Sequence, residues 1–189
     1  MIILGITGTL GAGKGTVVEY LTRHGFAHFS VRALLEEEMA RRGIPVSRDT
    51  MTPFANELRA QHGGDYLFRT LLARAQRAGN DAVIESVRTV DEAHALKALP
   101  QAVLLAVDAD RKLRYARIRA RGSALDDVSF EDFVRQEERE MESDNTAEQN
   151  LGAVMAMADF VLTNNGTKEA LFQNVAKVLA EIRAREGKR

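Results

Sequence analysis

The chain contains no cysteine among its 189 residues, which excludes disulfide bonds and thiolate zinc sites. It has no excess charge of either sign, because 26 Lys and Arg residues face 27 Asp and Glu residues, a formal net charge of −1. Attraction to phosphate therefore has to come from local groups of cations rather than from a general field. The sequence also lacks an apolar run of membrane-spanning length, a signal peptide, internal repeats and linkers. These absences predict one cytoplasmic domain with neither a nucleic-acid nor a membrane partner.

A glycine-rich segment at 8–16 is the most informative feature that is present. It follows the apolar run 2–7 and precedes an amphipathic segment at 16–24. A buried strand, a glycine turn and a helix N-terminus together form a phosphate-binding loop, since unpaired N–H groups and the helix dipole attract polyphosphate. Lys14 supplies a mobile charge for the β- and γ-phosphates, which an incidental glycine turn would not need. The residues predicted to hold a nucleoside triphosphate are Gly8, Gly11, Ala12, Gly13, Lys14, Gly15 and Thr16.

Apolar and amphipathic segments alternate along the rest of the chain. Segments such as 103–107 are apolar throughout, as expected for parallel strands that are covered on both faces. Five strands with helical crossovers predict a three-layer α/β fold, a five-stranded parallel sheet with helices on both faces. The predicted strands are 2–7, 26–30, 82–86, 102–107 and 159–163. The predicted helices are 16–24, 31–42, 52–62, 66–78, 90–98, 110–121, 130–142 and 168–185.

The loop sequence Gly-Lys-Gly-Thr resembles that of adenylate kinase and related nucleoside monophosphate kinases, because Gly15 replaces the usual hydroxyl residue after Lys14. Segments 41–43, 58–63, 85–88, 117–122, 133–139 and 165–167 extend the resemblance to an adenylate-kinase-like family of P-loop proteins. The family includes proteins described as nucleoside monophosphate kinases or dephospho-CoA kinases. The resemblance implies a P-loop NTPase fold over residues 1–189, with ATP and Mg²⁺ as cofactors. It also implies a helical acceptor-binding insertion at 31–79 and a short, zinc-free lid at 121–129.

The end of the third predicted strand carries an acid and an arginine. Glu85 follows three apolar residues, where P-loop proteins place an acid that orients Mg²⁺ and its waters. The resemblance gives Arg88 the role of gripping the acceptor phosphate. The family pattern has aspartate and proline here, and this chain has neither. A surface role for Arg88, capping the next helix, is the alternative.

The predicted helix 110–121 contains five arginines and one lysine in twelve residues. Arg114, Arg117 and Arg121 share one face, since they are spaced at i, i+3 and i+7. Guanidinium groups suit phosphate oxygens and the charge that spreads over a transferring phosphoryl group. We expect Arg117 and Arg121 to be functional, and Arg111, Lys112 and Arg119 to lie on the surface. A wholly solvated face, balanced by acids at 137–140, is the alternative.

Two further groups of residues complete the predicted site. Asn165 and Gly166 follow the last strand, where a turn can meet the adenine ring or cap the final helix. On the acceptor side we expect Ser30, Arg32 and Arg59, together with Arg88. Adenylate kinase has an arginine that grips AMP where this chain has Glu36, so the expected acceptor is a nucleotide other than AMP. Bulky Phe54 and Phe68 near the sugar site favour a deoxynucleotide.

The sequence therefore predicts a kinase that transfers the γ-phosphate of ATP to a small-molecule phosphate acceptor, a (deoxy)nucleoside monophosphate. The predicted catalytic residues are Lys14, Arg88, Arg117 and Arg121. Phosphorylation of a hydroxyl, as in dephospho-CoA kinase, needs a base, and no carboxylate follows the second strand until Glu36. That reaction is one alternative, and a regulatory ATPase that transfers nothing is another. A monomer and a homodimer both remain open.

Overall fold

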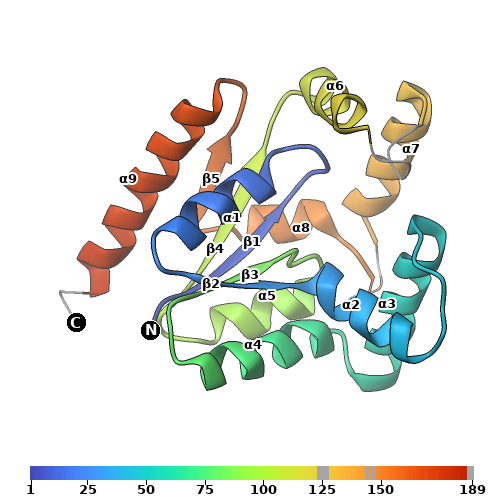
Figure 1. Ribbon diagram of the computed structural model, residues 1–189, viewed down its shortest axis with the longest axis horizontal. Coiled ribbons are helices and arrows are strands. Elements are labelled where there is room, and N and C mark those ends of the chain that lie inside the picture. The colour runs from blue at the N-terminus through green and yellow to red at the C-terminus, as the bar shows by residue number, and fades with distance from the viewer. Residues whose placement is uncertain (123–127, 144, 146–147, 187–189) are drawn as a thin grey trace.

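Five parallel strands form a single sheet in the order β2-β3-β1-β4-β5 (Figure 1). The computed structural model describes residues 1–122, 128–143, 145 and 148–186, apart from the side chains of residues 48, 49 and 186. The parallel sheet with surrounding helices confirms the fold class predicted from the sequence. The strands are β1 (Ile3–Gly8), β2 (Ala27–Ser30), β3 (Ala82–Glu85), β4 (Ala102–Asp108) and β5 (Phe160–Thr163). The helices are α1 (Lys14–Arg23), α2 (Val31–Arg41), α3 (Arg48–His62), α4 (Tyr66–Ala78), α5 (Val90–Lys97), α6 (Arg111–Arg121), α7 (Phe130–Met141), α8 (Leu151–Ala156) and α9 (Lys168–Glu186).

Two apolar cores lie on the two faces of the sheet, because successive strand residues point to opposite sides. Ile3 and Ile84 pack with α2, α3, α4, α5 and α8 on one face. Leu4 and Val83 pack with α1 and α9 on the other face. The sheet is thereby sandwiched, and the carboxyl ends of its strands remain available for a site.

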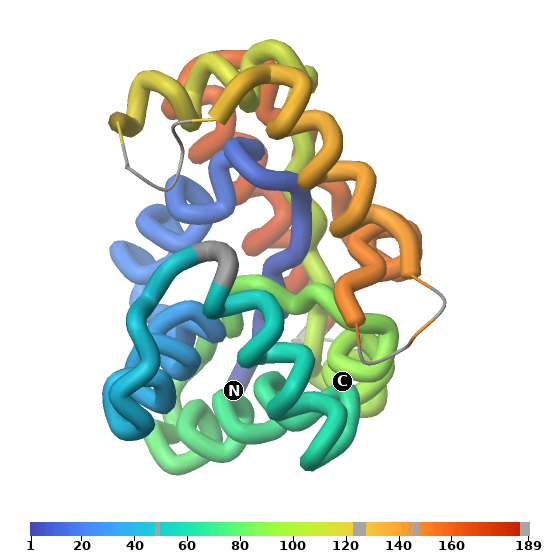
Figure 2. The backbone as a smooth tube through the Cα atoms, turned by 90° about the vertical axis from the view of Figure 1, so that its right-hand side faces the viewer, coloured from blue at the N-terminus to red at the C-terminus, as the bar shows by residue number. Residues whose placement is uncertain are grey.

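Two pairs of helices flank the glycine-rich loop between β1 and α1. Figure 2 shows α6 and α7 above this loop and α2 and α3 below it. The helices α2, α3 and α4 fill the connection from β2 to β3, which is the segment predicted as the acceptor insertion. Most of the predicted lid, at 123–127, lies outside the described residues.

The helices differ from the prediction by more than one residue at three places. Helix α3 begins at Arg48 rather than at 52, because Ser47 and Thr50 form a reciprocal capping box. Helix α1 begins at Lys14, directly after the glycine turn, rather than at 16. The short helix α8, which Asn150 caps, was not predicted, since six residues are too few to show a helical period.

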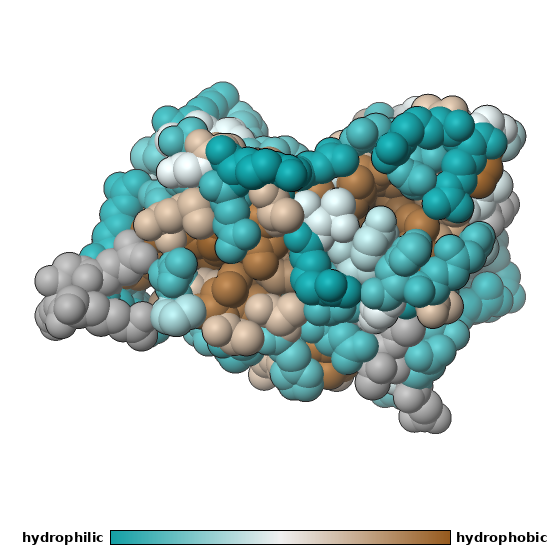
Figure 3. Space-filling model, turned by 90° about the horizontal axis from the view of Figure 1, so that it is seen from below, coloured by the Kyte–Doolittle hydropathy of each residue, from teal (hydrophilic) through white to brown (hydrophobic). Residues whose placement is uncertain are grey.

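The surface of the described residues exposes few large apolar side chains. Only Met1, Val46 and Val161 are large, hydrophobic and exposed within that part of the chain. In the view from below, polar side chains surround smaller apolar areas (Figure 3). Within the described ranges, none of the helices combines the length and apolar character needed to cross a bilayer.

Candidate active site

The glycine-rich loop is fixed by contacts that only glycine permits. Gly8 has φ +133°, and a Cβ there would lie 2.0 Å from the carbonyl oxygen of Val107. Gly13 has φ +103°, and a Cβ there would lie 2.4 Å from the side-chain nitrogen of Asn164. That same Asn164 amide donates to the carbonyl of Ala12 at 2.8 Å. The loop is therefore seated directly on the ends of β4 and β5.

Lys14 points back into this loop from the first turn of α1. Its Nζ donates to the carbonyl oxygens of Gly8 at 2.7 Å and Thr9 at 2.8 Å. Burial, and then the nearby Arg88 guanidinium, lower the pKa of Lys14 to about 7. A cation in this position is aimed at the space in which loop N–H groups would receive phosphate.

Glu85 and Arg88 lie at the carboxyl end of β3, where the sequence predicted them. The Oε2 atom of Glu85 lies 3.0 Å from Nε2 of His28 on β2, and this hydrogen bond lowers the pKa of the Glu85 carboxyl. The Nη1 atom of Arg88 donates to Glu140 at 3.2 Å and to Gln149 at 2.7 Å. Both partners of Arg88 come from distant segments, α7 and the segment before α8, which sequence spacing did not reveal.

The three arginines on one face of α6 have different roles in the structure. Arg114 is buried, its Nε donates to the carbonyl of Ala109 at 2.8 Å, and it forms an ion pair with Glu137 of α7. Arg117 has a buried Nη1 with no hydrogen-bond partner among the described residues, and Arg121 lines the same cleft as Arg117. An unsatisfied buried donor is costly, so Arg117 is the arginine that a bound anion would satisfy.

One cleft of about 1040 Å³ joins these groups. The loop residues line it together with residues of α2 and α3 and residues of α6 and α7. The polar and charged residues that line it include Lys14, Thr16, Ser30, Arg32, Glu85, Ser86, Arg88, Arg117, Arg121 and Glu140. This volume lies at the upper end of the range typical of small-molecule sites.

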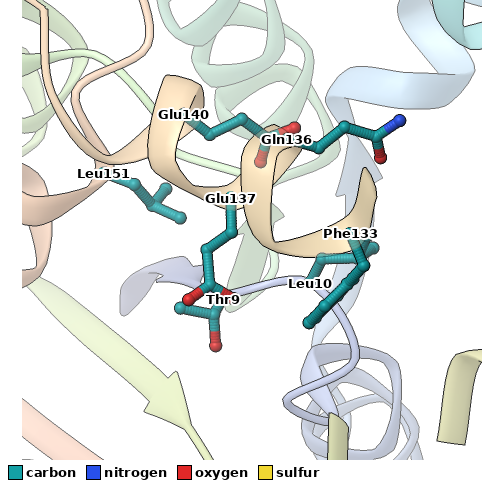
Figure 4. A pocket seen from close by; sticks show the side chains of 7 residues that line it. All are labelled: Thr9, Leu10, Phe133, Gln136, Glu137, Glu140 and Leu151. Carbon is teal, nitrogen blue, oxygen red and sulfur yellow. The ribbon is translucent and has the colours of Figure 1, made fainter. Parts of the chain in front are cut away.

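A second, much smaller cavity separates the loop from α7. It measures about 10 Å³, roughly the room that one water molecule needs. Figure 4 shows Glu137 reaching from α7 toward Thr9, and Phe133 lying beside Leu10. Helix α7 therefore packs directly on the glycine-rich loop.

The predicted acceptor residues divide into two groups. Ser30 and Arg32 line the cleft, with Ser30 capping α2 and Arg32 bound to Glu36 at 2.7 Å. Arg59 also borders the cleft, but its guanidinium is 1% exposed and is paired with Glu92. A direct role for Arg59 in acceptor binding stays a prediction.

The expectation that Phe54 and Phe68 lie near the acceptor sugar is wrong. Their side chains are 4% and 1% exposed, in the core that α3 and α4 form against the sheet. Apolar side chains on amphipathic helices pack inward, and these two pack into the core rather than line the cleft. The preference for a deoxynucleotide loses its basis.

Asn165 and Gly166 follow β5, as predicted. The Oδ1 atom of Asn165 accepts from the backbone N–H of Asp110 at 2.8 Å, which ties the β5 turn to the start of α6. Neither residue is among the described residues that line the cleft. Their role beside an adenine ring stays a prediction.

A metal would depend on few protein ligands here. Within the described ranges, no three His, Asp or Glu side chains are grouped closely enough to hold an ion. Mg²⁺ keeps several waters and accepts phosphate oxygens, so a single carboxylate such as Glu85 suits it.

A seated glycine loop, its lysine and two arginines around one cleft define a P-loop nucleotide-binding protein with a kinase-like fold. A family model described as an AAA domain matches residues 4–144. A UPF0200 protein of Pyrobaculum aerophilum is 30% identical over 183 residues, covering 96% of this chain and 98% of that protein. A UPF0200 protein of Thermococcus kodakarensis is 28% identical over 188 residues, covering 96% and 98%. The chain belongs to the AAA-domain family and to the UPF0200 proteins.

Solved structures agree with this fold. TT1252 from Thermus thermophilus superposes with a TM-score of 0.62 at 26% identity, covering 95% of this chain and 97% of that one. Shikimate kinase from Bacteroides thetaiotaomicron gives a TM-score of 0.62 at 15% identity, covering 95% and 98%. Dephospho-CoA kinase from Campylobacter jejuni gives 0.57 at 15% identity, covering 95% and 96%. Because the two kinases are only 15% identical to this chain, the comparison shows a shared fold and not a shared activity.

Proposed function

We propose that this protein transfers the γ-phosphate of ATP to a nucleoside monophosphate. The observation that carries the proposal is the convergence of Lys14, Arg88 and Arg117 on one cleft from three separate elements. Phosphoryl transfer depends mostly on positioning and on neutralising phosphate charge, and this arrangement supplies both.

Each cation has a distinct task in the proposed reaction. The loop N–H groups and Lys14 hold the β- and γ-phosphates, and Arg88 with Arg32 holds the acceptor phosphate. An oxygen of the acceptor phosphate forms a bond to the γ-phosphorus while the bond from that phosphorus to the β–γ bridging oxygen breaks, which releases ADP. Arg117 and Arg121 stabilise the charge on the transferring group. Glu85 would orient the waters of Mg²⁺, which supplies further charge neutralisation when bound.

A hydroxyl acceptor is the second candidate, and Glu140 is the observation that favours it. The sequence alone disfavours this reaction, because no carboxylate follows the second strand until Glu36. The fold brings a carboxylate from α7 into the cleft, 3.2 Å from the Arg88 guanidinium. Such a group can accept the proton of an attacking hydroxyl.

An acceptor screen with product analysis tests the proposal. The purified protein is incubated with ATP and Mg²⁺ and each ribo- or deoxynucleoside monophosphate, or with dephospho-CoA. A nucleoside diphosphate formed from the acceptor supports the proposal, and phosphorylation of dephospho-CoA alone supports the hydroxyl candidate. ADP release without a phosphorylated acceptor indicates a regulatory ATPase.

Lys14→Ala is the variant of this screen that should lose phosphoryl transfer. It removes the charge that faces the β- and γ-phosphates, so transfer should fall by a factor of about 100 or more while the fold persists. Lys112→Ala, on the exposed face of α6, should leave the rate unchanged. Near-normal turnover by Lys14→Ala would contradict a catalytic role for the loop.

A further inference from the structure

Glu92 is a fully buried carboxylate that four N–H groups satisfy. Its Oε1 accepts from Nε and Nη2 of Arg59, at 3.1 and 3.0 Å. Its Oε2 accepts from the backbone N–H of Arg88 at 2.8 Å and of Thr89 at 3.4 Å. An ionised carboxylate offers about four acceptor positions, so these donors fill it. One side chain thus joins α3 to the segment from which Arg88 projects.

The Arg59 end of this link belongs to the acceptor side of the cleft. Arg59 lies on α3, and three neighbours on the same helix, Met51, Pro53 and Ala55, line the cleft with it. The turn after α3 is also attached, since Thr89 Oγ1 donates to the carbonyl of Gly64 at 3.1 Å. Helix α3 and the start of α5 therefore hold each other at two places.

The Arg88 end belongs to the phosphate site. Glu92 fixes the Arg88 backbone through its N–H, and the Arg88 carbonyl accepts from the N–H of Asn150 at 3.0 Å. The guanidinium extends from this fixed backbone to Glu140 and Gln149 in the cleft. The contacts of the Arg88 backbone with Glu92 and Asn150 therefore determine the direction in which the Arg88 guanidinium extends.

We propose that Glu92 is a positioning residue that couples the acceptor-binding helix α3 to Arg88. The Arg59–Glu92 pair is 1% and 0% exposed, and separating a buried pair leaves an uncompensated charge. The pair therefore stays together when α3 shifts, and the displacement reaches the Arg88 backbone. An acceptor lying against α3 would in this way set the position of the arginine that grips its phosphate. The proposal rests on the proposed function for the role of Arg88.

Amide hydrogen exchange of the protein alone tests the coupling. Arg59→Met should speed exchange at the Arg88 N–H by about tenfold, although Arg59 does not touch that group. Leu58→Ala is the matched control, since Leu58 is a buried core residue of α3 that contributes nothing to Glu92. Arg59→Lys keeps the charge without the paired N–H groups, so it should give an intermediate rate and serves if Arg59→Met fails to fold. Equal protection of Arg88 in the Arg59 and Leu58 variants would overturn the proposal.

Kinetics with the accepted monophosphate provide the functional test. In Glu92→Gln an amide nitrogen replaces one carboxylate oxygen, so its hydrogens face N–H donors from which it cannot accept. The acceptor KM should therefore rise about tenfold, with little change in the KM for ATP. The effect should vanish when Arg88 is already alanine, because the positioned group is gone. A change of Tm with unchanged KM values would reduce Glu92 to a structural role. If no acceptor is phosphorylated, the proposed function fails, and the exchange rates still decide the coupling.

Discussion

Lys14 shows how a single residue at this site links protonation to binding. Burial and Arg88 lower its pKa from 10.5 to about 7, while Glu85 and Glu140 oppose this shift. Between these two values the unfolded chain binds more protons than the folded one, so the contribution of Lys14 to stability rises with pH across this window. Below pH 7 and above 10.5 that contribution is constant.

Nucleotide binding should therefore take up a proton at pH 8. Phosphates beside Lys14 favour the charged ammonium and raise its pKa, so the neutral fraction becomes protonated on binding. Calorimetric titration of ADP in buffers of different ionisation enthalpy measures this uptake. Lys14→Arg should abolish the uptake, because a guanidinium stays charged at this pH. Identical heats for the unmodified protein in all buffers would contradict the prediction.

Ser86 carries backbone strain next to Arg88. Its φ is +76°, the only positive value among the described non-glycine residues, and it lines the cleft. A left-handed conformation costs a non-glycine residue about 1–2 kcal/mol. Replacement by glycine removes this cost, but glycine also gives the unfolded chain more conformational freedom, which offsets part of the gain in stability. We expect Ser86→Gly to unfold in urea with a free energy about 1 kcal/mol above that of Ser86→Ala, which keeps the strain. A less stable glycine variant would show that the strain is not released.

Among the helices and strands, local patterns in the sequence identified most elements, and the features that were missed have weak local signals. The boundaries of α4 were predicted to the residue, because Gly63 and Gly64 precede an amphipathic run and Gly79 follows it. The start of α3 was missed, since the Ser47–Thr50 capping box contains no Glu or Gln to reveal it.

The site follows the same division. Lys14, Glu85 and Arg88 were placed by their spacing after apolar strands, and all three line the cleft. Arg59, Arg114 and Glu140 were not understood from the sequence, because burial and partners from distant segments decide what each one does. An arginine-rich face alone does not separate Arg114, which is structural, from Arg117, which has an unpaired donor.

The Arg114–Glu137 pair holds helix α7 on the glycine-rich loop. We therefore expect Arg114 to contribute far more to the free energy of unfolding than Arg111, which also binds Glu137. Arg114 also donates to the carbonyl of Leu10 at 3.3 Å, so its loss removes a donor from this loop carbonyl and leaves Glu137 with only the more exposed Arg111 as its cation. Arg114→Met should lower the free energy of unfolding by about 3–5 kcal/mol. Arg111 binds the same Glu137 from a 46% exposed position, so Arg111→Ala should cost under about 1 kcal/mol. Urea denaturation of both variants measures the difference, and equal costs would refute the buried-pair interpretation.

For the molecule as a whole, the cleft has two cationic walls, which come from different elements of the fold. Arg88 extends from the segment after β3, whereas Arg117 and Arg121 come from α6. A group that meets phosphate before the reaction contributes to binding, and one that meets charge developing in the transition state contributes to rate.

The two walls should therefore fail in different ways when each loses an arginine. Arg88→Ala should raise the acceptor KM about tenfold or more with a smaller change in kcat, because the proposed function pairs Arg88 with the acceptor phosphate in the ground state. Arg121→Ala should lower kcat by a similar factor with little change in the acceptor KM, because the proposed function places it against the transferring group. Steady-state kinetics of both variants, at varied acceptor and saturating ATP, separates the two effects. Arg119→Ala, on the exposed face of α6, is the control for loss of one positive charge. Equal and small effects of Arg88→Ala and Arg121→Ala would assign both arginines to a solvated surface and remove the basis for two walls acting on one reaction.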